Sequence, residues 1–183
     1  MVYWTIKILY AFFECLEQFI HPMCINHWDI EMNATREYDL RPATQSDEAT
    51  IRALVNGEHL NPMGLEWSNF IVAVLSSGEV IGCGQIKPHR DGSHELSSLV
   101  VASSWRSNGV ARAIIEHLIA THSGTLFLTC RLKLRPLYEK FGFRVAEKDE
   151  MTPYFRNLSR LAKGISLLTL GREGMLVMIR SGG

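Results

Sequence analysis

The chain has 183 residues, of which 46% are hydrophobic and 21% are charged, a balance typical of a globular protein. Nineteen basic and nineteen acidic residues cancel at neutral pH, so the net charge gives no reason to expect a nucleic-acid partner. The cysteines form no CxxC pair, which favours free thiols in a reducing, cytoplasmic compartment over a disulfide framework.

Residues 1–37 are predicted to form an apolar helical extension ahead of the main domain at 38–183. Its single polar stripe is formed by Lys7, Glu14, Gln18 and His21. The charges argue against a membrane span, which needs about 20 largely apolar residues, and a secretory signal is not expected either. Docking on the same chain, a homodimer contact and contact with a membrane surface remain open, as does a shorter chain that begins at Met32.

No metal site is expected in this sequence. One group has suitable side chains, namely His21, Cys24 and His27. Pro22 interrupts the helix that would align them, however, and no fourth ligand follows at the spacing of a zinc finger. Cys83 and Cys130 lie in apolar runs and are interpreted as small buried residues.

The main domain opens with a strand at 38–41, followed by a helix that ends at Gly57. Thr44 is expected to cap this helix, with Asp47 as the acid of a capping box. Three further strands are predicted at 70–75, 79–87 and 93–102, the first two joined as a hairpin. Glycines at positions 82 and 84 indicate a bulge or a close backbone approach in the second of these strands.

The period of the apolar residues then changes to that of a helix at 110–119. Four further elements follow: a strand at 125–130, a short helix at 135–141, a strand that starts at 143 and a last strand at 174–180.

The insert at 148–173 has apolar residues at helical spacing (Phe155, Leu158, Ala162 and Ile165) and a basic face (Arg156, Arg160 and Lys163). It is interpreted as a helix that covers the sheet, with contact to an acidic partner or an anionic membrane as the alternative. The order of elements predicts a mixed α/β domain with a right-handed parallel crossover after residue 101.

The turn between the strand at 93–102 and the next helix is a candidate anion site. Unsatisfied backbone N–H groups at a helix N-terminus favour negative charge, and Gly109 lets a phosphate approach the backbone. Arg106 and Arg112 supply positive charge nearby. The turn has neither the GKS/T of a P-loop nor the GxGxxG of a dinucleotide site, so an ordinary strand-to-helix turn is the alternative.

Two motifs give the chain a resemblance to the GNAT acetyltransferases. The six residues from Arg106 to Ala111 match the Arg/Gln-x-x-Gly-x-Gly/Ala motif of that family, and Leu137–Phe143 resembles its second signature, a helix that ends in Gly-Phe. The resemblance covers about three-quarters of the chain and implies a GNAT fold. That fold is a twisted, mostly antiparallel sheet of six to seven strands, flanked by helices, with a splay between strands four and five.

The resemblance also implies a site for acetyl-CoA as cosubstrate. The main chain of Leu99, Val100 and Val101 would pair with the pantetheine arm. The diphosphate would be held by the loop residues Arg106, Ser107, Asn108, Gly109, Val110, Ala111 and Arg112. Two positions depart from the family pattern, since a glycine is usual at Ser107 and a basic residue is common at Asn108.

For the chemistry, the resemblance implies a general acid and a base. Tyr138 matches the tyrosine of the second signature and would protonate the leaving thiolate, while Glu95 would take the proton of the amine, through water. His94 is a second candidate for the base, although strand alternation places it on the opposite face, and the N–H of Val101 is a candidate to polarise the carbonyl. The expected function is transfer of an acetyl group to a primary amine of a small molecule or a protein. The alternative is a non-catalytic acyl-CoA-binding module that acts as a sensor or scaffold.

Overall fold

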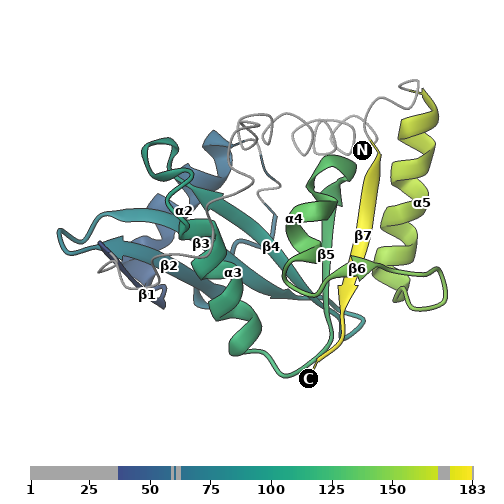
Figure 1. Ribbon diagram of the computed structural model, residues 1–183, viewed down its shortest axis with the longest axis horizontal. Coiled ribbons are helices and arrows are strands. Elements are labelled where there is room, and N and C mark those ends of the chain that lie inside the picture. Colours follow the sequence, from purple (N-terminus) through teal and green to yellow (C-terminus); the bar gives the residue numbers. More distant parts are fainter. Residues whose placement is uncertain (1–36, 59, 61–62, 169–173, 183) are drawn as a thin grey trace. The chain divides into compact units, whose positions relative to one another are not determined.

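The computed structural model describes residues 37–58, 60, 63–168 and 174–182, with the side chains of 163–168 left aside (Figure 1). The strands are β1 (Tyr38–Pro42), β2 (Phe70–Leu75), β3 (Val80–Pro88), β4 (His94–Val101), β5 (Leu126–Arg131), β6 (Arg144–Val145) and β7 (Met175–Arg180). The helices are α2 (Glu48–Gly57), α3 (Val110–Ala120), α4 (Arg135–Glu139) and α5 (Pro153–Leu168). Short 3₁₀ turns occur at η2 (Gln45–Asp47), η3 (Trp67–Asn69), η4 (Ser103–Trp105) and η5 (Leu132–Leu134). The helical extension predicted for the N-terminus lies outside the described residues, apart from Glu37.

The strands form one sheet of seven in the order β1-β2-β3-β4-β5-β7-β6. Strand β4 pairs with β5 in parallel, whereas the β1–β2, β5–β7 and β6–β7 pairs are antiparallel. The prediction of a mixed α/β domain with a mostly antiparallel sheet and one parallel crossover is therefore confirmed.

The described residues divide into two compact units. The first contains those up to Cys83 together with Val100–Ile114, and the second contains Gly84–Leu99 together with the chain from Ile115 onward. Each unit has an apolar cluster of its own. In the first, the buried residues are Ala43, Ile51, Val55, Leu65, Phe70, Val72, Val74, Cys83 and Val100. In the second, they are Phe127, Ala146, Phe155, Val177 and Ile179.

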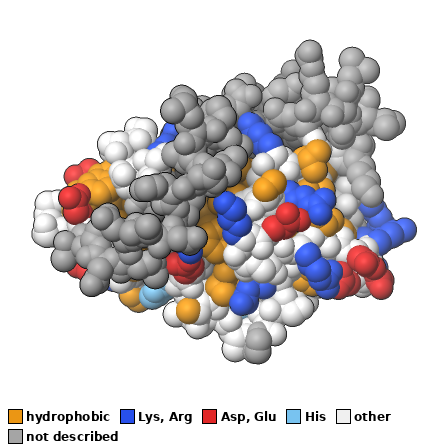
Figure 2. Space-filling view, viewed as in Figure 1, with side chains coloured by type: hydrophobic (Ala, Val, Ile, Leu, Met, Phe, Trp, Pro, Cys, Tyr) orange, Lys and Arg blue, Asp and Glu red, His pale blue; other side chains and the backbone are white. Residues whose placement is uncertain are grey.

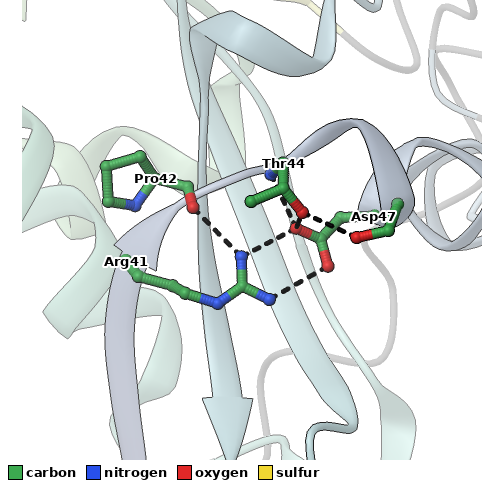
Figure 3. Close-up of polar contacts among 5 residues, drawn as sticks. Arg41, Pro42, Thr44 and Asp47 are labelled. Carbon is green, nitrogen blue, oxygen red and sulfur yellow. Dashed lines mark hydrogen bonds and ion pairs between the residues drawn. The ribbon is translucent and has the colours of Figure 1, made fainter.

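The 3₁₀ turn η2, which leads into α2 in the first unit, is fixed by the predicted capping box (Figure 3). The backbone N–H of Thr44 donates to Asp47 Oδ2 at 2.7 Å, and the Thr44 hydroxyl donates to the same oxygen at 2.8 Å. Arg41 adds a two-pronged ion pair, with Nη1 2.7 Å from Oδ2 and Nη2 3.0 Å from Oδ1. The Arg41 guanidinium, helped by the Thr44 donors, holds the pKa of the buried Asp47 carboxyl well below its usual range. This network anchors the connection from β1 to α2. The local sequence predicted the pairing of Thr44 with Asp47 but not the contribution of Arg41.

Gly82 in β3 lies where α3 approaches the sheet. A Cβ placed on Gly82 would be 3.1 Å from the Val100 carbonyl oxygen, 3.1 Å from Val110 Cγ1 and 3.3 Å from Ile114 Cδ1. Real Cβ atoms rarely approach their neighbours so closely. The predicted close approach at this glycine is confirmed, and it sets how tightly the first turns of α3 pack.

In the second unit, α5 covers β7 and β5 through one buried face (Figure 1). Phe155 is fully buried and stacks on Phe127, with ring centroids 4.5 Å apart. Leu158 packs against the same cluster, and Ala162 is buried as well, so the predicted apolar stripe is confirmed as far as the side chains are described. Basic and acidic side chains are interspersed on the face seen in Figure 2. In this unit Arg135 pairs with Glu139 and Arg144 pairs with Glu150.

Candidate functional site

The turn from β4 into α3 contains two residues in left-handed backbone conformation. Ser107 has φ of 67° and Gly109 has φ of 75°. The residues from Ser107 to Gly109 are exposed, whereas Val110 is 1% exposed and anchors the helix start in the core. The usual glycine of the family motif at position 107 has a physical reason here, because a serine pays strain in this region that a glycine does not.

The backbone donors at the N-terminus of α3 can be assigned from its first hydrogen bond. That bond runs from the N–H of Ala113 to the carbonyl of Gly109 at 3.0 Å. The N–H groups of Val110, Ala111 and Arg112 precede that bond, so the helix itself offers them no acceptor. A Cβ on Gly109 would meet no heavy atom within 4 Å, which means that the space beside its backbone is open. N–H groups of a first helical turn, beside the open space at Gly109, suit an anion such as a diphosphate.

Arg106 has a partner that the local sequence did not reveal. Its guanidinium forms an ion pair with Glu58, the residue that follows α2, and its Nε donates to the carbonyl oxygen of Val101 at 3.4 Å. These contacts tie the turn to the end of α2 and to the end of β4. Arg112 is exposed on the first turn of α3.

Strand β4 changes direction in its second half. Among the described residues, the register of β4 against β5 runs over His94–Leu126 and Glu95–Phe127 and is not continued beyond them. Ser98 has φ of 51°, and its hydroxyl accepts a hydrogen bond from Gln85 Nε2 at 3.0 Å. A residue in left-handed conformation within a strand bends it. Parallel pairing of β4 with β5 is therefore shown at His94 and Glu95, and the splay expected between the two strands stays a prediction.

Glu95 lies at the last paired position of β4 and is 5% exposed. Its Oε2 is 2.9 Å from Nε2 of His89, and its Oε1 accepts a hydrogen bond from the Thr129 hydroxyl at 3.0 Å. A buried carboxylate with a hydrogen-bond partner on each oxygen is held in one orientation. His89 lies between the strands predicted at 79–87 and 93–102, and its contact with Glu95 was not predicted. The signal was the hairpin itself, since the N–H of His89 donates to the Ser93 carbonyl at 2.8 Å and folds the ring back toward β4.

Aromatic rings from the start of α5 close over His89. The Tyr154 ring stacks on the imidazole with centroids 3.7 Å apart, and the Phe155 ring meets it edge-on at 5.5 Å. Burial, together with the nearby carboxylates of Glu95 and Asp91, raises the pKa of Tyr154 to about 12. The Tyr154 hydroxyl is therefore protonated at neutral pH.

Tyr138 lies in α4 and is 8% exposed. Its carbonyl oxygen accepts the N–H groups of Phe141 at 3.0 Å and Phe143 at 3.3 Å, and its ring meets Phe143 edge-on at 6.2 Å. Burial, with a smaller contribution from Cys130, raises the pKa of the Tyr138 phenol well above its ordinary value. The phenol is consequently a proton donor over the whole neutral range.

The remaining candidates have other surroundings. The His94 ring contacts His122, with centroids 4.9 Å apart, rather than the partners of Glu95. Cys83 and Cys130 are buried free thiols, and burial raises the pKa of each to about 12, which agrees with their interpretation as packing residues.

In the part of the chain that is described, no three His, Cys, Asp or Glu side chains gather as metal ligands. The helices within those same residues include none long and apolar enough to cross a bilayer.

Comparison with known proteins agrees with this geometry. Residues 66–145 match the family model of the acetyltransferase (GNAT) domain. A stretch of 87 residues is 33% identical to the mouse protein named Cysteine-rich protein 2-binding protein, and 34% identical to the human one. That stretch is 45% of this chain and only 11% of either relative, so this chain spans a small part of their length.

Solved structures resemble the chain over most of its length. N-acetylglutamate synthase from Neisseria gonorrhoeae, in complex with coenzyme A and N-acetyl-glutamate, superposes with a TM-score of 0.60 at 18% identity, covering 80% of this chain and 35% of that one. The ribosomal-protein-S18-alanine N-acetyltransferase from Escherichia coli superposes with a TM-score of 0.57 at 17% identity, covering 80% and 94%. The chain therefore has the GNAT fold, and its residues 66–145 match the model of a GNAT acetyltransferase domain.

Proposed function

We propose that this protein is an acetyl-CoA-dependent N-acetyltransferase that moves the acetyl group to a primary amine by direct attack. The observation that carries the proposal is the turn at 107–112, whose first-turn N–H groups and open glycine suit a diphosphate, within residues that match the GNAT domain model. Acetyl-CoA is bound there as substrate. The main chain of Leu99, Val100 and Val101 pairs with its pantetheine arm.

Glu95 serves as the base in this proposal. An amine arrives as an ammonium ion and must lose a proton before it can attack the thioester. Glu95 is buried, and its two oxygens are oriented by His89 and Thr129, while each oxygen keeps a further lone pair for the incoming proton. The proton moves to Glu95 through water, and the neutral amine attacks the acetyl carbonyl carbon.

Tyr138 serves as the acid. When the tetrahedral intermediate collapses, the carbon–sulfur bond breaks and the thiolate of coenzyme A needs a proton. The raised pKa of Tyr138 keeps its phenol protonated until that moment, and the proton that the new amide nitrogen loses restores it.

The acceptor is a primary amine of a small molecule or a protein. Two of the similar structures are named for α-amino chemistry, one by its bound N-acetyl-glutamate and the other by an alanine of a ribosomal protein. Amino acids and N-terminal peptides therefore come first in a panel of acceptors, followed by lysine side chains and polyamines.

The test is release of coenzyme A from acetyl-CoA in the presence of each amine in the panel. Tyr138→Phe and Glu95→Gln should each lower kcat by about 10²–10⁴-fold without weakening acetyl-CoA binding. Tyr38→Phe is the matched control, because Tyr38 has the same 8% exposure as Tyr138 and contacts Trp105 instead. Binding of acetyl-CoA without turnover on any amine would favour the non-catalytic acyl-CoA module. An absence of acetyl-CoA binding in calorimetry would overturn both readings.

A further inference from the structure

His89 is enclosed by side chains of the second unit. Its imidazole is 7% exposed. The ring is stacked by Tyr154 at 3.7 Å, met edge-on by Phe155 at 5.5 Å, and joined to Glu95 at 2.9 Å. Its backbone N–H is engaged by Ser93. These contacts on one face, one edge and one nitrogen fix the orientation of the His89 ring. Its Nε2 therefore points at the Glu95 carboxylate.

The direction of the hydrogen bond follows from the chemistry of the pair. An ionised carboxylate only accepts hydrogen bonds, so Nε2 of His89 must carry the proton when Glu95 is ionised. The Thr129 hydroxyl donates to the other carboxylate oxygen at 3.0 Å. Glu95 is therefore held by two donors from two directions, one on the loop after β3 and the other on β5.

We infer that His89 is the positioning residue for the base. The inference rests on the proposed function, since it assigns a role within that reaction. His89 donates its Nε2–H to Oε2 of Glu95, which fixes the orientation of the buried carboxylate and of its remaining lone pairs toward the amine. Without the donor, one oxygen of a carboxylate that is 5% exposed would lose its hydrogen-bond partner, and the carboxylate would no longer be held in this orientation.

The surroundings of the ring make this role independent of other titrations near neutral pH. The groups that face the pair are Tyr154 from α5, Thr129 from β5 and Asp91, whose Oδ2 accepts the N–H of Tyr154 at 2.9 Å. Tyr154 ionises only at about pH 12. Burial acts to raise the pKa of Asp91, but hydrogen bonds from Ser93 and Tyr154 prevail and leave that pKa well below its usual range. Neither Tyr154 nor Asp91 therefore changes charge near neutral pH.

Two substitutions separate the hydrogen bond from the packing of the ring. His89→Phe keeps an aromatic ring against Tyr154 but removes the donor, while His89→Gln restores an N–H donor near the position of Nε2 and does not titrate. His117→Phe, on the surface of α3, is the control for loss of an imidazole elsewhere. Thermal unfolding of each variant establishes that it is folded before its kinetics are measured.

With an amine that the wild type acetylates, His89→Phe should lower kcat by about 10–100-fold and leave acetyl-CoA binding unchanged. His89→Gln should recover most of the activity, and His117→Phe should match the wild type. Equal losses of kcat in His89→Phe and His89→Gln would overturn the inference in favour of a packing role, as would full activity of His89→Phe.

A second readout does not depend on turnover. Imidazole nitrogen NMR of the wild type should show His89 with its proton on Nε2 at neutral pH, and Glu95→Gln should perturb that signal. A proton on Nδ1 instead would overturn the inference even in an active enzyme. A wild type that is inactive on every amine would overturn the proposed function, and the positioning role with it, whatever the tautomer.

Discussion

Replacing Gly109 by alanine tests the anion site with a cost that the structure defines. The residue has φ of 75°, and a methyl group placed there would meet no heavy atom within 4 Å. No steric clash therefore adds to the strain of a left-handed alanine, which is about 1–2 kcal/mol. We expect the free energy of unfolding to fall by about that amount.

The effect on acetyl-CoA is expected to be larger. The methyl group would occupy the open side of the turn, where the diphosphate comes closest to the backbone in our proposal. A hydrogen bond from a backbone N–H to a charged group contributes about 1.5–3 kcal/mol, so the loss of one such bond weakens binding by about 10–150-fold.

Gly78→Ala provides a matched control. Gly78 lies in the turn between β2 and β3, with φ of 89° and likewise nothing within 4 Å of its Cβ position. Both variants should lose similar stability in urea unfolding, but calorimetry should find weakened acetyl-CoA binding in Gly109→Ala alone. Equal dissociation constants for the two variants would refute the assignment of the diphosphate to this turn.

Three further predictions concern the structure around the site. Asp47→Asn should lower the free energy of unfolding at pH 7 by about 2 kcal/mol through loss of the cap and the Arg41 pair. Because the folded-state pKa of Asp47 is depressed, its contribution is complete above about pH 5 and is lost as the pH falls through the folded value. Urea unfolding at pH 7 and pH 3 should therefore show a smaller difference between variant and wild type at pH 3, and an equal difference would contradict the reasoning. Gly82→Ala should cost about 1–3 kcal/mol in the same assay, because its Cβ would be crowded by α3, and an unchanged midpoint would refute that contact. Cys83 and Cys130 should resist maleimide at pH 7 in the folded protein and react only in denaturant, as mass spectrometry of their peptides would show, since burial raises their pKa values to about 12.

The parts of the fold that the sequence predicted depend on neighbouring residues. The capping box joins Thr44 to an acid three residues later, and the apolar stripe of α5 repeats from Phe155 to Leu158. Gly82 was conspicuous because a glycine within a strand needs a packing reason. Each of these signals is contained in a short window, where the periodicity of a helix or strand decides which side chains share a face.

The parts that were missed depend on contacts between distant residues or on unusual backbone. Arg106 pairs with Glu58, which is 48 positions away, so the motif alone indicated a phosphate contact rather than an ion pair within the protein. The kink at Ser98 uses a left-handed conformation that serine rarely adopts, and no local pattern predicts it. The third omission was His89, which becomes a partner of Glu95 only when the hairpin closes. The assignments of Glu95 and Tyr138 as base and acid stay predictions that the experiments above test.

The ion pair between Arg106 and Glu58 has a consequence for how the proposed diphosphate site responds to solution conditions. With this guanidinium engaged inside the protein, the proposed site at 107–112 would rely less on Arg106 and more on peptide dipoles, which carry no net charge and do not titrate. Added salt screens such short-range, directed contacts much less than it screens a flexible surface cation. Nucleotide-like substrates would thus be retained over a broad range of ionic strength.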